Sequence, residues 1–293
     1  MELKIEKILV PTDFSELSMT AMKYAGLVAR ETGAKLLILH VMESYEYNTI
    51  LQDVINYNEV LQEAVDKKMA KIKEEHEELW NVEGEVKIVQ GKIHQQIKNV
   101  ADQEDADLIV MGTHGATGIT DLGRFVLGSN ASRTVQLTKI PVLSIRGERE
   151  PQFNKIVLPL DVTKETTKKL DTTILLAKTF DAEIHAVSVS TFFEEFSTDI
   201  YDLRKKLREV AQKITDAGVE CHTEMLRHDS VPDSVVEYSD NINADLVVIM
   251  TKEEKDPDKA GLGATARQII NRSNAPVLSM HPRHAMIGEK VEG

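Results

Sequence analysis

Several features that define other classes of protein are scarce in this chain of 293 residues. Its one cysteine, Cys221, excludes an internal disulfide and a cysteine metal cluster, which is typical of a reducing compartment. Its apolar runs, such as residues 36–39, are far too short to span a bilayer, and residues 2–10 show no signal-peptide pattern. A net charge of −13 disfavours nucleic acid and anionic membranes as partners, because both are polyanions. We therefore expect a cytoplasmic globular protein.

The chain contains an internal duplication. Residues 7–13 (KILVPTD) recur as 155–161 (KIVLPLD), an offset of 148. Residues 105–111 (DADLIVM) recur as 243–249 (NADLVVI), an offset of 138, and residues 141–145 (PVLSI) recur as 276–280 (PVLSM), an offset of 135. Three collinear matches indicate a tandem repeat of a unit of about 140 residues, an ordinary domain size.

Glycine is distributed unequally between the two copies. Copy two has TKEEKD at residues 251–256, where copy one is rich in glycine, and then keeps only Gly261 and Gly263. A glycine-rich turn before a helix binds phosphate through backbone N–H groups, so the first copy is suited to an anion and the second is not. The matching stretch of copy one carries Gly112, Gly115, Gly118, Gly123, Gly128 and Ser129.

Short apolar strands alternate with amphipathic helices in both copies. Copy one has strand patterns at residues 8–10, 36–41, 86–89, 108–111 and 142–145, and helical patterns follow the first strand, span 48–80 and 93–101, and begin near Asn130. Copy two shows strands at 156–158, 184–189, 246–250 and 277–280, with a helical stripe over 193–214. This alternation predicts an α/β fold with parallel sheets covered by helices on both faces.

The domain boundaries follow from the repeat and from the segment between the copies. Residues 147–153 hold a charge cluster and Pro151, which is typical of a linker. We expect an N-terminal domain over residues 1–147, a C-terminal domain over 153–282, and a loose tail over 283–293.

The residues suited to ligand chemistry follow the predicted strands. In an open parallel sheet, ligands bind beyond the carboxyl ends of strands where the strand order reverses. Pro11, Thr12 and Asp13 follow the first strand, His40 and Val41 end the second, and the glycine loop follows the fourth. If strands one and four are neighbours, these segments meet at one crevice. An acid there can accept from ribose hydroxyls, and the helix start at 128–130 adds N–H donors.

These motifs resemble the universal stress protein family over both halves of the chain. The resemblance implies two doubly wound five-stranded parallel sheets of strand order 3-2-1-4-5, with ATP held by G-x2-G-x9-G-(S/T) in nucleotide-binding members. It implies Asp13 on the ribose and Pro11 and Val41 near adenine. It also implies that closing strands 142–145 and 277–280 pair the two domains. The full predicted binding set is Pro11, Thr12, Asp13, Val41, Met111, Gly112, Thr113, Gly115, Gly118, Gly128, Ser129 and Asn130.

The glycine loop departs from the family pattern in its length. The family places 13 positions between the first and last glycines, and copy two keeps 13 between Met250 and Gly263, whereas copy one has 16 between Gly112 and Gly128. Two registers remain open: Gly112 with Gly115, which we favour because Gly112 directly follows the strand, and Gly115 with Gly118.

Structural roles compete with each functional interpretation. The loop glycines could serve only a tight connection, and Asp13 and its counterpart Asp161 could serve only as helix caps. A lone loop histidine, His114, is better explained as a polar or solvated side chain than as an acid–base catalyst. The acidic run 74–78, which includes His76, is better explained as a solvated helix face than as a metal site.

We therefore expect an ATP-binding stress-response sensor or regulator, with ATP in the N-terminal domain only and Mg²⁺ or Mn²⁺ on its phosphates. Walker, nucleophile-elbow and zincin motifs are missing, so no catalytic residue is predicted. The alternatives are a slow ATPase or nucleotidyl-transferring enzyme of the adenine-nucleotide α-hydrolase class, or a ligand-free scaffold. Two chains could also pair into a homodimer, but the sequence does not give the number of subunits.

Overall fold

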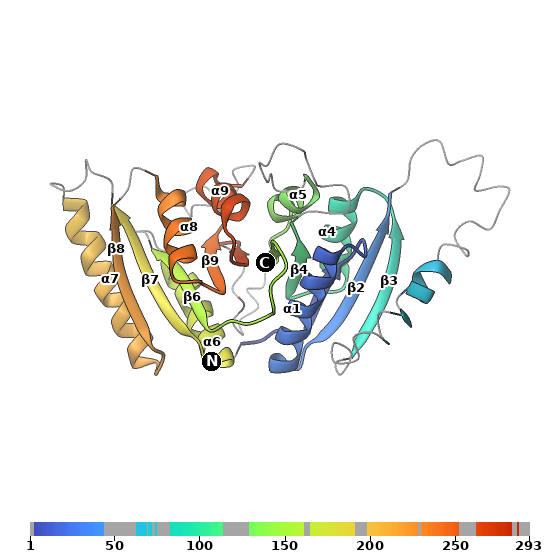
Figure 1. Cartoon of the computed structure of the whole chain (residues 1–293), viewed down its shortest axis with the longest axis horizontal. Helices are drawn as coiled ribbons and strands as arrows, with labels where there is room; N and C mark the ends of the chain where they lie inside the picture. The colour runs from blue at the N-terminus through green and yellow to red at the C-terminus, as the bar shows by residue number, and fades with distance from the viewer. Residues whose placement is uncertain are drawn as a thin grey trace.

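The structure is a computed structural model of the chain, shown in Figure 1. It describes residues 3–43, 63–68, 70–71, 74, 83–113, 129–160, 165–190, 198–227, 230–251, 262–282 and 286.

The described part of the first half contains the five predicted strands, with helices after the first, third and fourth of them as the sequence predicts. The helix predicted over residues 48–80 lies mostly outside the described residues. Helix α1 begins after Ser15, whose side chain accepts from the Ser18 N–H, and ends at Gly33 in the left-handed conformation (φ 74°). The elements are β1 (Lys7–Pro11), α1 (Glu16–Thr32), β2 (Lys35–Met42), β3 (Gly84–Gln90), α4 (Ile93–Gln103), β4 (Leu108–Gly112), α5 (Ser129–Leu137) and β5 (Val142–Ile145).

The second half repeats the order of the strands, and its helix α7 lies between the second and third of them, where most of the first half's counterpart lies outside the described residues. Ser230 caps helix α8 through its side chain, as Ser15 caps α1. The elements are β6 (Lys155–Leu160), α6 (Glu165–Phe180), β7 (Glu183–Ser190), α7 (Thr198–Asp216), β8 (Cys221–Arg227), α8 (Val231–Asn241), β9 (Leu246–Met250), α9 (Ala264–Arg272) and β10 (Val277–Met280).

All ten strands belong to one sheet of order β3-β2-β1-β4-β5-β10-β9-β6-β7-β8. Within each half the strands are parallel and follow the predicted order 3-2-1-4-5. The closing strands β5 and β10 pair antiparallel, with Leu143 opposite Leu278, so the predicted pairing of the two domains is confirmed. Figure 1 shows the halves side by side, with β3 and β8 at opposite ends of the sheet.

Helices cover both faces of the sheet, and alternate strand residues supply the two cores. On one face, side chains such as Ile8 and Ile156 pack with α1, α6 and α7. On the other face, Leu9 and Val157 pack with α4, α5, α8 and α9. Among the described residues, no helix combines the length and the apolar character needed to cross a membrane.

One aspartate fixes the chain before the first strand of each half. Asp107 accepts from the backbone N–H groups of Glu6 and Lys7 at 2.8 and 3.0 Å. Its counterpart Asp245 accepts from the N–H groups of Asn154 and Lys155 at 3.0 and 3.1 Å, and also from the side chain of Gln152 at 2.7 Å. These two carboxylates explain why an aspartate recurs in the duplicated motif.

An aromatic cluster joins the two halves at the linker. The Phe153 ring lies 5.5 Å from the ring of Tyr24 on α1 and 4.9 Å from that of Phe180 on α6. Burial raises the pKa of Tyr24 to about 12, because an ionised phenol would lose its hydration there. The linker is therefore anchored to both domains.

Candidate functional site

The strand order reverses between β1 and β4, because β2 and β3 extend to one side of β1 and β4 and β5 to the other. Ile8 pairs with Leu108 and Leu9 with Ile109, so the condition set by the sequence analysis is met. In a doubly wound sheet such a reversal opens a crevice at the carboxyl ends of the strands. The segments after β1 and after β4 both begin at this edge.

The turn after β1 is held by Thr12. Its N–H donates to the Leu39 carbonyl at 2.8 Å, and its buried hydroxyl lies 3.1 Å from the Ser18 hydroxyl and accepts from the Phe14 N–H at 3.0 Å. The Thr12 hydroxyl therefore shapes the turn. Asp13 is exposed and accepts from the Ser15 N–H at 3.0 Å. Ser15 is the helix cap, so Asp13 supports the cap without being the cap itself.

The end of β2 is joined to this turn by His40. Its Nδ1 lies 2.9 Å from the Thr12 carbonyl oxygen, which can only accept, so Nδ1 carries the proton. Its ring lies 4.9 Å from the ring of Phe14, a residue in the left-handed region (φ 63°). Val41, the next residue, is partly buried against the core that contains α4 and α5. The ends of β1 and β2 therefore form one connected unit.

Gly112 lets the end of β4 lie close to helix α1. A Cβ atom at this position would stand 3.0 Å from Cγ of Leu17 and 3.4 Å from the Leu17 backbone carbon, so a side chain would not fit without a shift. Met111 before it and Thr113 after it are buried, and the Thr113 N–H donates to the Ile145 carbonyl at 2.9 Å. The absence of a side chain at Gly112 thus has a packing cause as well as the predicted ligand role.

Helix α5 begins at Ser129, one residue before the predicted start. Oδ1 of Asn130 lies 3.4 Å from Nδ1 of His94 near the start of α4, so the first turns of these two helices are in contact. His94 was not among the predicted site residues, and only the spatial approach of α4 to α5 reveals it. The predicted loop residues Gly115, Gly118 and Gly128, with His114, lie outside the described residues.

The corresponding edge of the second half carries a lysine. Lys169 of α6 is only 6 % exposed, and its ammonium group donates to the Pro159 carbonyl at the end of β6. By the repeat offset of 148, Lys169 takes the place of Ala21 and Leu160 the place of Thr12. The Thr251 N–H donates to the Met280 carbonyl at 2.8 Å, and the Gly263 N–H to the Thr251 carbonyl at 3.0 Å. Lys169 was not predicted to matter at this position, although the repeat alignment places it opposite an alanine.

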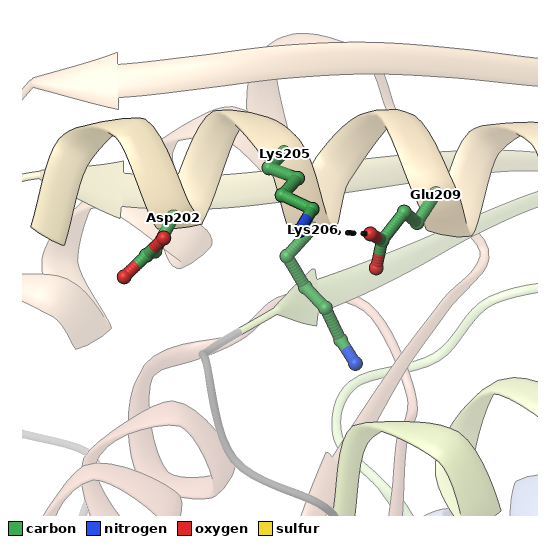
Figure 2. A pocket seen from close by; sticks show the side chains of 4 residues that line it. All are labelled: Asp202, Lys205, Lys206 and Glu209. Atoms are coloured by element: carbon green, nitrogen blue, oxygen red, sulfur yellow. Dashed lines mark ion pairs between the residues drawn. The ribbon is translucent and has the colours of Figure 1, made fainter.

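A surface depression of about 220 Å³ lies on α7 (Figure 2). Asp202, Lys205, Lys206 and Glu209 line it, and Lys205 forms an ion pair with Glu209 at 4.0 Å. These side chains belong to a single helix, and all except the half-buried Lys206 are exposed, so the depression is an ordinary charged helix face. It shares no residue with the strand ends.

The structure bears on two other features singled out from the sequence to different extents. Burial raises the pKa of the Cys221 thiol, which favours the unreactive protonated form at neutral pH. Of the acidic run 74–78, only Glu74 is among the described residues.

The family assignment rests on matches over both halves. The model of the Universal stress protein family matches residues 4–146 and again residues 152–281. Universal stress protein MJ0531 of Methanocaldococcus jannaschii is 33% identical over 143 residues, 48% of this chain and 82% of the relative. Universal stress protein MJ0577 of the same organism is 30% identical over 161 residues, 50% of this chain and 98% of the relative.

A solved structure matches nearly the whole chain. The crystal structure of a universal stress protein from Archaeoglobus fulgidus covers 95% of this chain and 97% of its own, with a TM-score of 0.74 and 20% sequence identity. At that identity the likeness shows the fold, a pair of similar domains in one chain. Together with the two family matches, it shows that the chain belongs to the universal stress protein family, as a tandem member.

Proposed function

We propose that the chain is a cytoplasmic, nucleotide-dependent regulator of the stress response that binds ATP in its first half. The observation that carries the proposal is the pairing of β1 with β4, which brings Asp13 and Gly112 to one edge of the sheet. An exposed carboxylate at the end of one strand and a glycine at the end of its neighbour suit a ribose and the adjoining phosphate.

The ligand contacts follow from the order of the segments along this edge. Asp13 accepts hydrogen bonds from the ribose hydroxyls, while Pro11, the Thr12 backbone and Val41 contact the adenine. Met111, Gly112 and Thr113 follow the ribose-phosphate, with Gly115 or Gly118 according to the loop register. The N–H groups of Gly128, Ser129 and Asn130 face the phosphates at the start of α5, where the helix dipole favours an anion. Mg²⁺ or Mn²⁺ would join this site through the phosphates.

The buried lysine of the second half supports a single ATP site. Lys169 lies beside the end of β6, where the first half has the small side chain of Ala21. The lysine fills space with its own chain and is already bonded to Pro159. Glu253, Glu254 and Asp256, which lie outside the described residues, would add repulsion against a triphosphate.

Occupancy of the site, more than turnover, is the proposed signal. His40 uses its Nδ1 proton on the Thr12 carbonyl, so this imidazole supports the turn. The pairing of β5 with β10 continues the sheet from the half that carries the proposed ATP site into the other half. An ordering of the first half by a ligand would therefore reach the second half through the hydrogen bonds between these two strands.

Calorimetry with ATP on nucleotide-stripped protein tests the proposal, with Asp13→Ala as the variant and Asp161→Ala as its matched control. A hydrogen bond to a charged group contributes about 1.5–3 kcal/mol, so Asp13→Ala should weaken ATP binding by about 10- to 100-fold. Asp161→Ala, at the same repeat position, should leave the affinity unchanged. Equal effects of the two variants would overturn the assignment of ATP to the first half.

Gly128→Glu tests the phosphate end of the same site. A carboxylate at the start of α5 would face the triphosphate, so binding should become undetectable. We choose Gly128 over Gly112 because a side chain at Gly112 would also displace Leu17. Undetectable ATP binding by the unmutated protein at high micromolar concentration would refute the proposal as a whole.

A further inference from the structure

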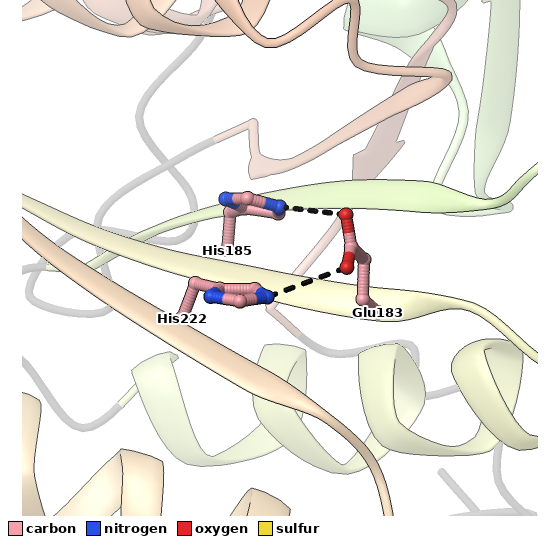
Figure 3. Close-up of side chains that lie close together, drawn as sticks. All are labelled: Glu183, His185 and His222. Carbon is pink, nitrogen blue, oxygen red and sulfur yellow. Dashed lines mark hydrogen bonds and ion pairs between the residues drawn. The ribbon is translucent and has the colours of Figure 1, made fainter.

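Two histidines and one glutamate of the second half form a compact cluster, shown in Figure 3. Nε2 of His185 lies 3.1 Å from Oε1 of Glu183, and Nε2 of His222 lies 3.3 Å from Oε2 of the same carboxylate. The two imidazole rings are stacked, with centroids 4.7 Å apart. One potential ligand atom from each residue lies within 4.8 Å of the other two.

The sheet register assembles this cluster from distant parts of the sequence. His185 of β7 is the direct partner of His222 of β8, so both side chains leave the sheet on the same face. Glu183 precedes His185 by two residues and therefore shares that face as well. All three lie near the amino ends of their strands, whereas the proposed ATP site lies at the carboxyl ends.

The distance from each imidazole nitrogen to the carboxylate is compatible with a shared tetrahedral metal ion. Zinc binds imidazole nitrogen and carboxylate oxygen at about 2.0–2.2 Å, which places neighbouring ligand atoms about 3.4 Å apart. The two carboxylate–imidazole distances of 3.1 and 3.3 Å are close to that value. An ion of this size can therefore replace the shared protons with small side-chain movements.

Groups around the cluster hold its side chains in place, as the hydrogen-bond partners of metal ligands do in metal sites. The hydroxyl of Tyr238 on α8 lies 2.9 Å from Nδ1 of His185, which leaves Nε2 to face Glu183. A carboxylate oxygen of Glu220 lies 3.3 Å from Nε2 of His222 and adds negative charge. Lys155 approaches Glu183 at 3.7 Å, but it is 43% exposed and can turn into solvent.

The first half lacks these ligands at the same positions. Lys35 and Leu37 of β2 take the places of Glu183 and His185 by the repeat offset of 148, and Glu85 takes the place of His222 by register. The Lys35 ammonium pairs with Glu83 at 2.7 Å. The imidazole pair is thus specific to the second half.

We propose that Glu183, His185 and His222 form a binding site for a zinc-like divalent transition-metal ion. The set of two imidazoles and one carboxylate is the donor chemistry that such ions prefer, whereas Mg²⁺ prefers oxygen ligands alone. His185 is almost fully buried and His222 is 46% exposed, so the ion enters beside His222. Water or Glu220 completes the coordination.

Metal titration of the full chain, first stripped with a chelator, tests this site. Co²⁺ is followed by its visible absorption and Zn²⁺ by calorimetry, in the absence of nucleotide. We expect one equivalent of either ion and no comparable binding of Mg²⁺. His222→Gln should weaken binding by at least about tenfold, because even the loss of an outer-shell partner costs that much. Glu183→Gln should do the same.

The matched control is Glu85→Gln, at the position in the first half that corresponds to His222. It should keep the wild-type affinity. His222 and Glu85 are both exposed enough that their variants should fold, and circular dichroism of the metal-free proteins checks this. An absence of Zn²⁺ and Co²⁺ binding, or binding that survives both His222→Gln and Glu183→Gln, would overturn the proposal. Because no nucleotide is present, failure here is distinct from failure of the ATP proposal.

Discussion

The two halves of the chain share a scaffold and differ at both the carboxyl edge of the sheet, where the parallel strands end, and the opposite edge, where they begin. At the carboxyl edge, the first half has Asp13 and Gly112, whereas the second has the buried Lys169. At the opposite edge the difference is reversed: the second half has the paired His185 and His222, and the first has Leu37 and Glu85 in register. A duplicated sheet can therefore keep the contacts that build it while the side chains at the ends of its strands differ between the copies.

Removal of the aromatic ring of Phe153 should have the largest effect on stability, because this ring packs against both halves. Phe153→Ala removes a buried ring between Tyr24 and Phe180, and such truncations cost about 3–5 kcal/mol in the free energy of unfolding. Urea denaturation measures the change. Tyr201→Ala is the control, since that side chain is 65% exposed and should change stability by about 0.5 kcal/mol or less. Similar effects of the two variants would show that Phe153 does not join the halves.

The two strand-anchoring aspartates allow a direct comparison of equivalent positions. Asp245 is 4% exposed and has three hydrogen-bond donors, whereas Asp107 is half-buried and has two. We expect Asp245→Ala to lower the free energy of unfolding by about 3 kcal/mol and Asp107→Ala by about 2 kcal/mol. Urea denaturation should give this order.

The exposed Asp102 provides a reference for the two aspartates. Among the described residues its ion-pair partner is the surface residue Lys98, so Asp102→Ala should cost about 0.5 kcal/mol or less. A larger loss for Asp107→Ala than for Asp245→Ala would contradict the role assigned to burial and to the third donor.

The smallest expected effects are at the ends of α1 and α6. Gly33 and Asp181 occupy the same repeat position, and both are left-handed, with φ of 74° and 52°. Glycine adopts this conformation without steric cost, so Asp181→Gly should stabilise the protein by about 0.5–1 kcal/mol. Gly33→Ala should destabilise it by about 1 kcal/mol, although among the described residues no atom outside the adjoining backbone lies within 4 Å of the added Cβ. Thermal unfolding detects both shifts, and shifts of the same sign would refute this explanation.

Much of the fold could be predicted from the sequence because its strands are short, apolar and repeated. The predicted bounds of β5, β9 and β10 agree with the structure, and the strand order followed from the family resemblance. β8 was not predicted, because its exposed residues His222 and Glu224 interrupt the apolar pattern of an edge strand. Periodicity detects buried strands better than edge strands.

The candidate site could be predicted only in part. Motif positions located Asp13 and Gly112, but the contact between Gly112 and Leu17 depends on how closely α1 packs on β4. The cluster of His185 and His222 was missed because 37 positions separate them in sequence, and only the register of β7 with β8 joins them. Loop residues Gly115, Gly118 and Gly128 lie outside the described residues, so their ligand roles stay predictions.

The antiparallel contact of β5 with β10 has a consequence for how the protein behaves at low abundance. Because both strands belong to one polypeptide, the linker sets the local concentration of one edge at the other, and dilution cannot separate them. Each strand is four residues long and mostly apolar, and on its own it would expose a row of unpaired backbone groups that could pair with another chain. Because the two strands are tethered, each covers the exposed backbone groups of the other in every molecule, even when the protein concentration in the cell is low.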